Sequence, residues 1–247
     1  MKKVAEVTLI FWVMKICATT LGETAGDLMS MTLNVGYGAS SLILIGLFLV
    51  TVVAQILSKK YRPALYWAVI LSTSMAGTTM SDYIDRTLGL GYTEGSVILV
   101  SILMIILAIW HKTEGTLSVE NISKPRTEMF YWTAILFSNT LGTALGDFLS
   151  DSSGLGFSGG AALIGGLLAL IVMAYFWTKI SRVLLFWLAF ILTRPFGATF
   201  GDLLTKPLDK GGLNFGTAGS SIILGAILLG LVIVAMLKER RVEHTEL

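Results

Sequence analysis

One six-residue phrase occurs four times in this chain, each time within an apolar segment and each time ending in aspartate. It reads glycine, three variable residues, then Gly or Ser, and it covers residues 22–27, 77–82, 142–147 and 197–202. A carboxylate in a membrane segment is costly unless it is paired, protonated, solvated or bound to a cation. The four aspartates, Asp27, Asp82, Asp147 and Asp202, therefore predict a polar site for a cation or a proton, built by internal symmetry.

The phrase lies in a chain that is 54% hydrophobic and only 14% charged, whereas soluble domains carry roughly a quarter charged residues. This balance predicts an all-α integral membrane protein. Its apolar segments are close to the ~20 residues that cross a hydrocarbon core of ~30 Å. Eight transmembrane helices are expected, approximately over residues 7–29, 38–58, 64–84, 92–110, 129–149, 158–178, 183–204 and 218–237. The first apolar run contains a copy of the phrase and lacks a convincing cleavage site, so we expect it to be retained.

A tryptophan stands 15 residues before each aspartate, at Trp12, Trp67, Trp132 and Trp187. Successive tryptophans of this set are 55, 65 and 55 residues apart, which predicts two pseudo-symmetric halves, 1–120 and 121–247, offset by 120 residues. Each half is expected to hold two repeats, and the four repeats span residues 1–62, 63–120, 121–181 and 182–247. A Gly- or Asn-rich turn ending in an aromatic residue follows each aspartate. In the fourth repeat it comes three residues late, which indicates an insertion around residues 207–211.

Each repeat holds two spans, an even number, so all four are expected to share one orientation, as parallel repeats about an axis along the membrane normal. The turns inside repeats hold only Arg86, Lys206 and Lys210. The termini and the loops between repeats hold thirteen basic residues: Lys2, Lys3, Lys59, Lys60, Arg62, Lys112, Lys124, Arg126, Lys179, Arg182, Lys238, Arg240 and Arg241. The positive-inside bias therefore predicts that both termini are cytoplasmic.

Four tandem two-helix repeats, each with a tryptophan and a Gly-x-Thr/Ala-x-Gly/Ser-Asp phrase, resemble a family of bacterial membrane proteins known as a repeat of unknown function. The resemblance covers nearly the whole chain. It implies the bacterial cytoplasmic (inner) membrane and a four-repeat architecture, but it supplies no substrate.

The depth of the aspartates follows from helix geometry, because 15 residues of α-helix span roughly 22 Å. If the tryptophans anchor at the cytoplasmic headgroups, the aspartates form a ring in the outer part of the bilayer, facing a vestibule open to the outside. In the alternative interpretation, each aspartate caps a turn or the next helix.

Small residues accompany the aspartates. The glycine five positions earlier allows helices to approach closely, or it exposes carbonyls to an ion. Thr24, Thr79 and Thr199 offer hydroxyl ligands, although threonines in helices more often bond to carbonyls of their own helix.

The repeats differ at charged positions. Glu23 lies four residues before Asp27 on the same helix face, and we interpret the two as a coupling pair. Arg194 and Asn139 occupy the same position in different repeats, and Lys15 lies further toward the cytoplasm. Five acids against Lys15 and Arg194 leave a nominal charge of minus three, which has to be met by protons or cations. Arg194 either neutralises a carboxylate in the empty site or forms a structural ion pair.

Carboxylate, hydroxyl and amide oxygens suit Mg, Ca or Mn rather than Zn or Cu(I). The metal ligands predicted here are Glu23 and the four repeated aspartates. The chain lacks a nucleotide-binding phrase, so an ion gradient has to supply the energy. We therefore expect a secondary transporter or exporter of a cation, such as divalent manganese, coupled to protons.

A second class of function is also compatible with these residues. The alternative is a membrane sensor or scaffold that binds an ion or a partner protein without transport. No Ser/His or His-rich array supports an enzyme, and scattered basic residues do not favour nucleic acid. The expected partners are the lipid bilayer and the cation substrate, and assembly into a homo-oligomer stays open.

Overall fold

The computed structural model describes residues 3–119, 122 and 124–245. These residues form eight α-helices and no strand, which confirms the predicted all-helical fold. The helices are α1 (Leu9–Asp27), α2 (Tyr37–Leu57), α3 (Pro63–Asp82), α4 (Gly91–Glu114), α5 (Pro125–Asp147), α6 (Gly156–Trp177), α7 (Arg182–Thr205) and α8 (Thr217–Thr245). Among the described residues, five helices are long and apolar enough to cross a membrane: α2, α4, α6, α7 and α8.

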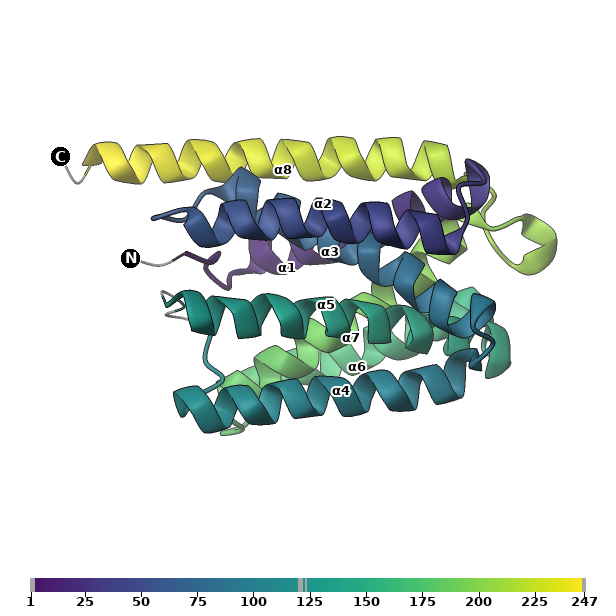
Figure 1. The fold of residues 1–247 in the computed structure, drawn as a ribbon, viewed down its shortest axis with the longest axis horizontal. Coiled ribbons are helices and arrows are strands. Elements are labelled where there is room, and N and C mark those ends of the chain that lie inside the picture. The colour runs from purple at the N-terminus through teal and green to yellow at the C-terminus, as the bar shows by residue number, and fades with distance from the viewer. Residues whose placement is uncertain (1–2, 120–121, 123, 246–247) are drawn as a thin grey trace.

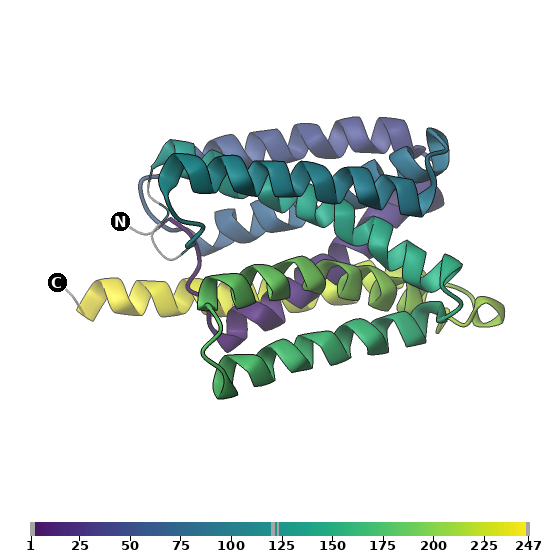
Figure 2. The same ribbon diagram turned by 90° about the horizontal axis from the view of Figure 1, so that it is seen from below.

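The odd-numbered helices form the inner part of the bundle (Figures 1 and 2). They pack in a closed order, with α1 against α3, α3 against α5, α5 against α7, and α7 against α1. Each even-numbered helix packs on the first helix of the following repeat, and α8 closes the circle by packing on α1. The four repeats are therefore interlocked, because each one is covered by its neighbour.

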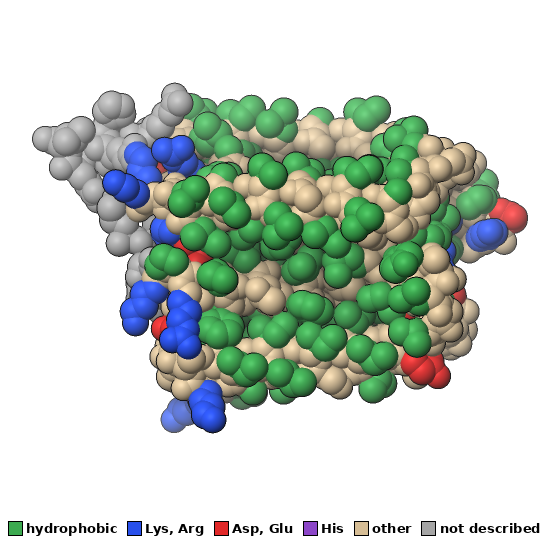
Figure 3. Space-filling view, viewed as in Figure 1, with side chains coloured by type: hydrophobic (Ala, Val, Ile, Leu, Met, Phe, Trp, Pro, Cys, Tyr) green, Lys and Arg blue, Asp and Glu red, His purple; other side chains and the backbone are tan. Residues whose placement is uncertain are grey.

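Inner and outer helices differ in composition, because the outer helices cover the inner ones. The outer helices turn long aliphatic side chains outward, such as Leu42 and Ile222, and hydrophobic side chains spread over the face of the molecule seen in Figure 3. Polar and charged residues of α1, α3 and α5 face inward and are buried. Burial of these residues inside the bundle explains why the three helices lack the uniform hydropathy of the other five.

Glycines allow the close approach of the inner helices. A Cβ on any of Gly22, Gly77, Gly142 or Gly197 would come closer than 3.0 Å to the neighbouring inner helix. The atoms it would meet belong to the residue eight positions before the aspartate of the next repeat, which is Asn139 in the case of Gly77. The same contact recurs around the whole ring, so a packing role of these glycines is built into the repeat.

The turn after each inner helix has two residues of positive φ separated by one residue. These pairs are Asn34 and Gly36, Gly89 and Gly91, Gly154 and Gly156, and Asn214 and Gly216. Asn214 stands 60 residues after Gly154, whereas Gly89 stands 55 residues after Asn34. The insertion in the fourth repeat is therefore five residues rather than the three predicted from the aromatic residue, and it contains a 3₁₀ turn, Leu208–Lys210.

The tryptophans do not serve as headgroup anchors. Trp67, Trp132 and Trp187 are at most 5% exposed, and only Trp12 is half-buried. Each ring packs on an aromatic residue of another repeat, with centroid distances of 5.5–5.8 Å over the pairs Phe11–Trp67, Tyr66–Trp132, Phe186–Trp12 and Trp110–Trp187. The interlocked outer helices hold the rings inside the bundle, where they form an aromatic girdle.

Both chain ends lie at one end of the bundle (Figure 1), where Lys and Arg side chains gather (Figure 3).

Candidate functional site

The centre of the bundle is a stack of side-chain layers, because residues four apart lie on one helix face. Every layer takes one residue from each inner helix, and all sixteen residues of the first four layers are buried. Starting from the aspartates, the layers are Asp27, Asp82, Asp147 and Asp202; then Glu23, Thr78, Thr143 and Ala198; then Thr19, Ser74, Asn139 and Arg194; then Lys15, Ile70, Ile135 and Phe190. The tryptophans of the girdle follow.

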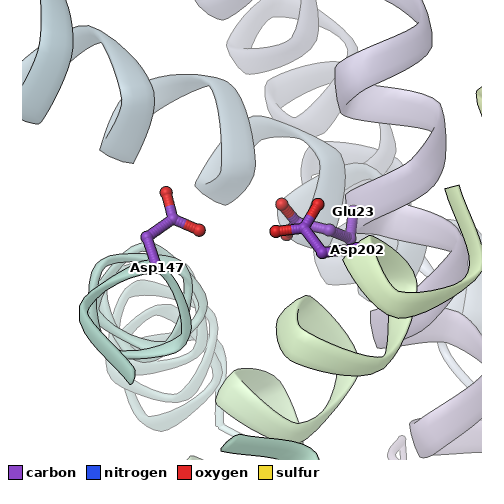
Figure 4. Close-up of side chains that lie close together, drawn as sticks. All are labelled: Glu23, Asp147 and Asp202. Atoms are coloured by element: carbon purple, nitrogen blue, oxygen red, sulfur yellow. The ribbon is translucent and has the colours of Figure 1, made fainter. Parts of the chain in front are cut away.

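Three carboxylates converge in the first two layers. One oxygen from each of Glu23, Asp147 and Asp202 lies within 4.8 Å of the others. Figure 4 shows them reaching toward one another from α1, α5 and α7. We call these three residues the carboxylate cluster; Asp27 and Asp82 are not part of it.

Glu23 sits at the point where all four repeats meet. Its Oε2 lies 2.9 Å from Nη1 of Arg194 and accepts hydrogen bonds from Thr78 and Thr143 at 3.2 and 3.5 Å. Nη2 of Arg194 donates to the carbonyl of Ser74 at 3.3 Å and to Thr78. Arg194 is fully buried, so this ion pair is shielded from solvent. The predicted coupling partners Glu23 and Asp27 therefore have different neighbours. Glu23 groups with Asp147 and Asp202, whereas Asp27 pairs with Lys206.

Two further bases lie over the aspartates. Arg86 bridges Asp82 and Asp147, with N–O distances of 3.0 and 3.1 Å. Lys206 bridges Asp202 and Asp27 in the same way, at 3.0 and 2.8 Å.

These two bases change the charge balance of the site. The five acids now face four bases, because Arg86 and Lys206 join Lys15 and Arg194. The formal charge is minus one instead of the predicted minus three. From the sequence, Arg86 and Lys206 are expected only as residues of the turns inside the repeats. Each nevertheless stands four residues after an aspartate, a spacing that favours an ion pair on a helix.

The capping alternative finds no support in the local geometry. Asp27, Asp82 and Asp147 each precede a π-helical turn and make no side-chain capping bond to it. Asp202 lies within α7. The aspartates also do not line an open vestibule, since their exposure is at most 4% and Arg86 and Lys206 lie over them.

Deeper in the stack, Lys15 is completely buried. Its Nζ lies 3.4 Å from Oδ1 of Asn139 and 4.1 Å from the centre of the Phe190 ring. The amide of Asn139 in turn donates to Thr73 at 2.8 Å. Within the described part of the chain Lys15 forms no ion pair, so the predicted role as a direct charge partner of the acids is not realised.

The predicted hydroxyl ligands bond elsewhere. Thr79 and Thr199 donate to carbonyls of their own helices. Thr24 donates to the carbonyl of Leu21 and accepts a bond from Ser221 of α8. Instead, Thr78 and Thr143 donate hydrogen bonds to Glu23. Both threonines occupy the position equivalent to Glu23 in their own repeats, and this equivalence was the signal in the sequence that could have identified them.

The fold and this centre define an all-helical bundle of four interlocked repeats around buried charged residues. The chain belongs to the family described as "Repeat of Unknown Function (DUF347)", whose model matches residues 10–61, 65–116, 130–181 and 185–241. Each matched segment contains one of the repeated tryptophans and one of the repeated aspartates, and the expected family resemblance is confirmed. No curated protein and no solved structure matches the chain.

Proposed function

We propose that this protein is a secondary transporter of cations in the bacterial cytoplasmic membrane, with both termini in the cytoplasm and a divalent ion such as manganese as cargo. The observation that carries the proposal is the carboxylate cluster, whose oxygens lie within 4.8 Å of one another. Two oxygens bound to one ion stand at most about 4–5 Å apart, because ligand distances are about 2.0–2.6 Å. The cluster is therefore compatible with one oxygen-preferring cation.

The surroundings of the cluster support transport rather than simple binding. Ionisable residues inside an apolar helical bundle are typical of ion and proton pathways. Buried polar side chains continue from the cluster through Asn139 to Lys15, and the aromatic girdle lies beyond them. Cargo enters from the end opposite the termini and leaves when the inner helices rearrange around the girdle. The energy comes from an ion gradient, with protons as the coupling ion.

A membrane sensor or scaffold remains the second candidate. The observation that favours it is the pairing of the acids with Arg194, Arg86 and Lys206, since such a network also holds four repeats together without cargo. This candidate predicts no movement of cations across the membrane.

Cation binding is tested by thermal unfolding of the purified protein. An excess of about 100 times the Kd stabilises a native state by about 2.7 kcal/mol, so Mn²⁺ should raise the melting temperature. Choline chloride of equal ionic strength should not. D147N and D202N should abolish the shift, and D209N, a change at an exposed acid near the same end, should retain it. Absence of a shift with Mn²⁺, Mg²⁺ and Ca²⁺ in the wild type would contradict the proposal.

A further inference from the structure

Every acid of the carboxylate cluster already has a basic partner. Glu23 pairs with Arg194, Asp147 with Arg86 and Asp202 with Lys206, at 2.9, 3.1 and 3.0 Å. A cation that joined this arrangement would add uncompensated positive charge to a buried site, which is costly. Binding therefore requires at least one base to leave.

The three bases differ in their freedom to leave. Arg194 has a fully buried side chain with bonds to two inner helices. The side chains of Arg86 and Lys206 are 31% and 21% exposed and lie beyond the ends of α3 and α7. Each can therefore turn toward solvent and keep its charge hydrated, which Arg194 cannot do.

Arg86 and Lys206 also occupy equivalent positions, 120 residues apart in the two halves. Each joins the aspartate of its own repeat to that of another repeat. The first and third repeats carry Met31 and Asp151 at this position. The repeat fold therefore does not require a base here, and the two bases form a pair of matched bridges.

The bridge at Lys206 is formed by one ammonium group. Its Nζ lies 3.0 Å from Oδ1 of Asp202 and 2.8 Å from Oδ2 of Asp27, and both carboxylates are buried. A metal ion would coordinate the same two oxygens directly, without the alignment that an N–H donor needs.

We propose that Arg86 and Lys206 are tethered cations that occupy the acidic ring in the cargo-free protein and are displaced by the arriving cation. This inference rests on the proposed function. Lys206 is the closer stand-in for a metal ion, because its single ammonium group bridges two carboxylates. Competition with these side chains sets the affinity of the site and favours cargo of higher charge density than an ammonium group.

The first experiment measures the Kd of Mn²⁺ for the purified full-length protein by titration calorimetry. Loss of a charge-assisted competitor worth about 1.4 kcal/mol should tighten binding by about tenfold in K206Q. K206R keeps the charge and should bind like the wild type. K210Q is the matched control, because it removes the same charge from an exposed lysine in the same loop, and it should change the Kd by less than about twofold, as distant surface charges are screened.

The second experiment needs no variant. Amine acetylation followed by mass spectrometry reports how exposed each lysine is, and Lys210 serves as the internal reference. Mn²⁺ should speed the labelling of Lys206 several-fold and leave that of Lys210 unchanged.

The inference is overturned if Mn²⁺ binds the wild type and D202N abolishes binding, yet K206Q binds no more tightly and Lys206 labelling does not rise. It is also overturned if K210Q tightens binding as much as K206Q does. The proposed function survives both results. Absence of Mn²⁺ binding in the wild type and K206Q alike would overturn the proposed function together with this inference.

Discussion

At the scale of single residues, the ion pair of Glu23 and Arg194 is the main departure from four-fold symmetry. The two residues are equivalent to threonine or alanine and to serine, threonine or asparagine in the other repeats. Both are buried, and they lie 2.9 Å apart. Removing one partner of such a pair leaves an uncompensated buried charge, whereas removing both does not.

We expect E23Q to lower the free energy of unfolding by about 3–5 kcal/mol, because Arg194 is then unpaired. The double variant E23Q/R194Q should recover most of that loss. Unfolding by SDS, followed by circular dichroism, measures both effects. Additive losses in the double variant would show that the pair contributes as two independent residues.

The sequence predicted part of this residue-level arrangement. The common position of the aspartates follows from the repeated phrase, and the asymmetry of Glu23, Arg194 and Lys15 is visible by comparing the repeats. The partners were not predictable in the same way. Which acid meets Arg194 depends on the order of the inner helices around the ring, and that order is a property of tertiary packing.

At the scale of helices, the apolar segments placed all eight elements within four residues of their observed ends, except that α8 continues to Thr245, eight residues beyond the predicted end at 237. Pro63 and Pro125 begin α3 and α5, as expected for prolines at helix starts. The tryptophans were misjudged because an aromatic residue near a helix end has two stable environments, the lipid interface and the protein interior. Coverage by neighbouring repeats decides between them, and sequence periodicity does not report it.

The inner glycines give a prediction at this scale. In G77A the new methyl group would meet the backbone of α5 at Asn139, which cannot move aside easily. Overpacking of this kind costs about 1–3 kcal/mol.

Thermal unfolding should therefore show a lower melting temperature for G77A. The control is G225A on α8, where no atom lies within 4 Å of the added carbon apart from the chain neighbours and the adjacent backbone of the same helix. It should be neutral or slightly stabilising. Equal effects of the two changes would contradict the close approach of α3 and α5.

At the scale of the whole molecule, the two halves repeat the same bridge, Asp82–Arg86–Asp147 and Asp202–Lys206–Asp27. The bridges cross between repeats, so the charged centre exists only when all four repeats are assembled. Both termini and the loops between repeats lie at one end of the bundle (Figure 1).

The proposed membrane orientation follows from that arrangement and from the distribution of basic residues. A reporter inserted after Gly115 should give a cytoplasmic signal, and one inserted after Asp209 should give the signal of the opposite compartment. The same compartment for both reporters would contradict the two-span repeat in the membrane.

The central claim is that the carboxylate cluster carries a cation across the membrane, and flux into proteoliposomes tests it most directly. Vesicles containing a trapped Mn²⁺ indicator and the wild-type protein should fill under an imposed proton gradient. Vesicles with D147N or D202N should fill no faster than protein-free vesicles, while D209N should match the wild type. If the wild type moves none of Mn²⁺, Mg²⁺ and Ca²⁺ under either direction of the gradient, the claim is contradicted and the charged centre is a scaffold.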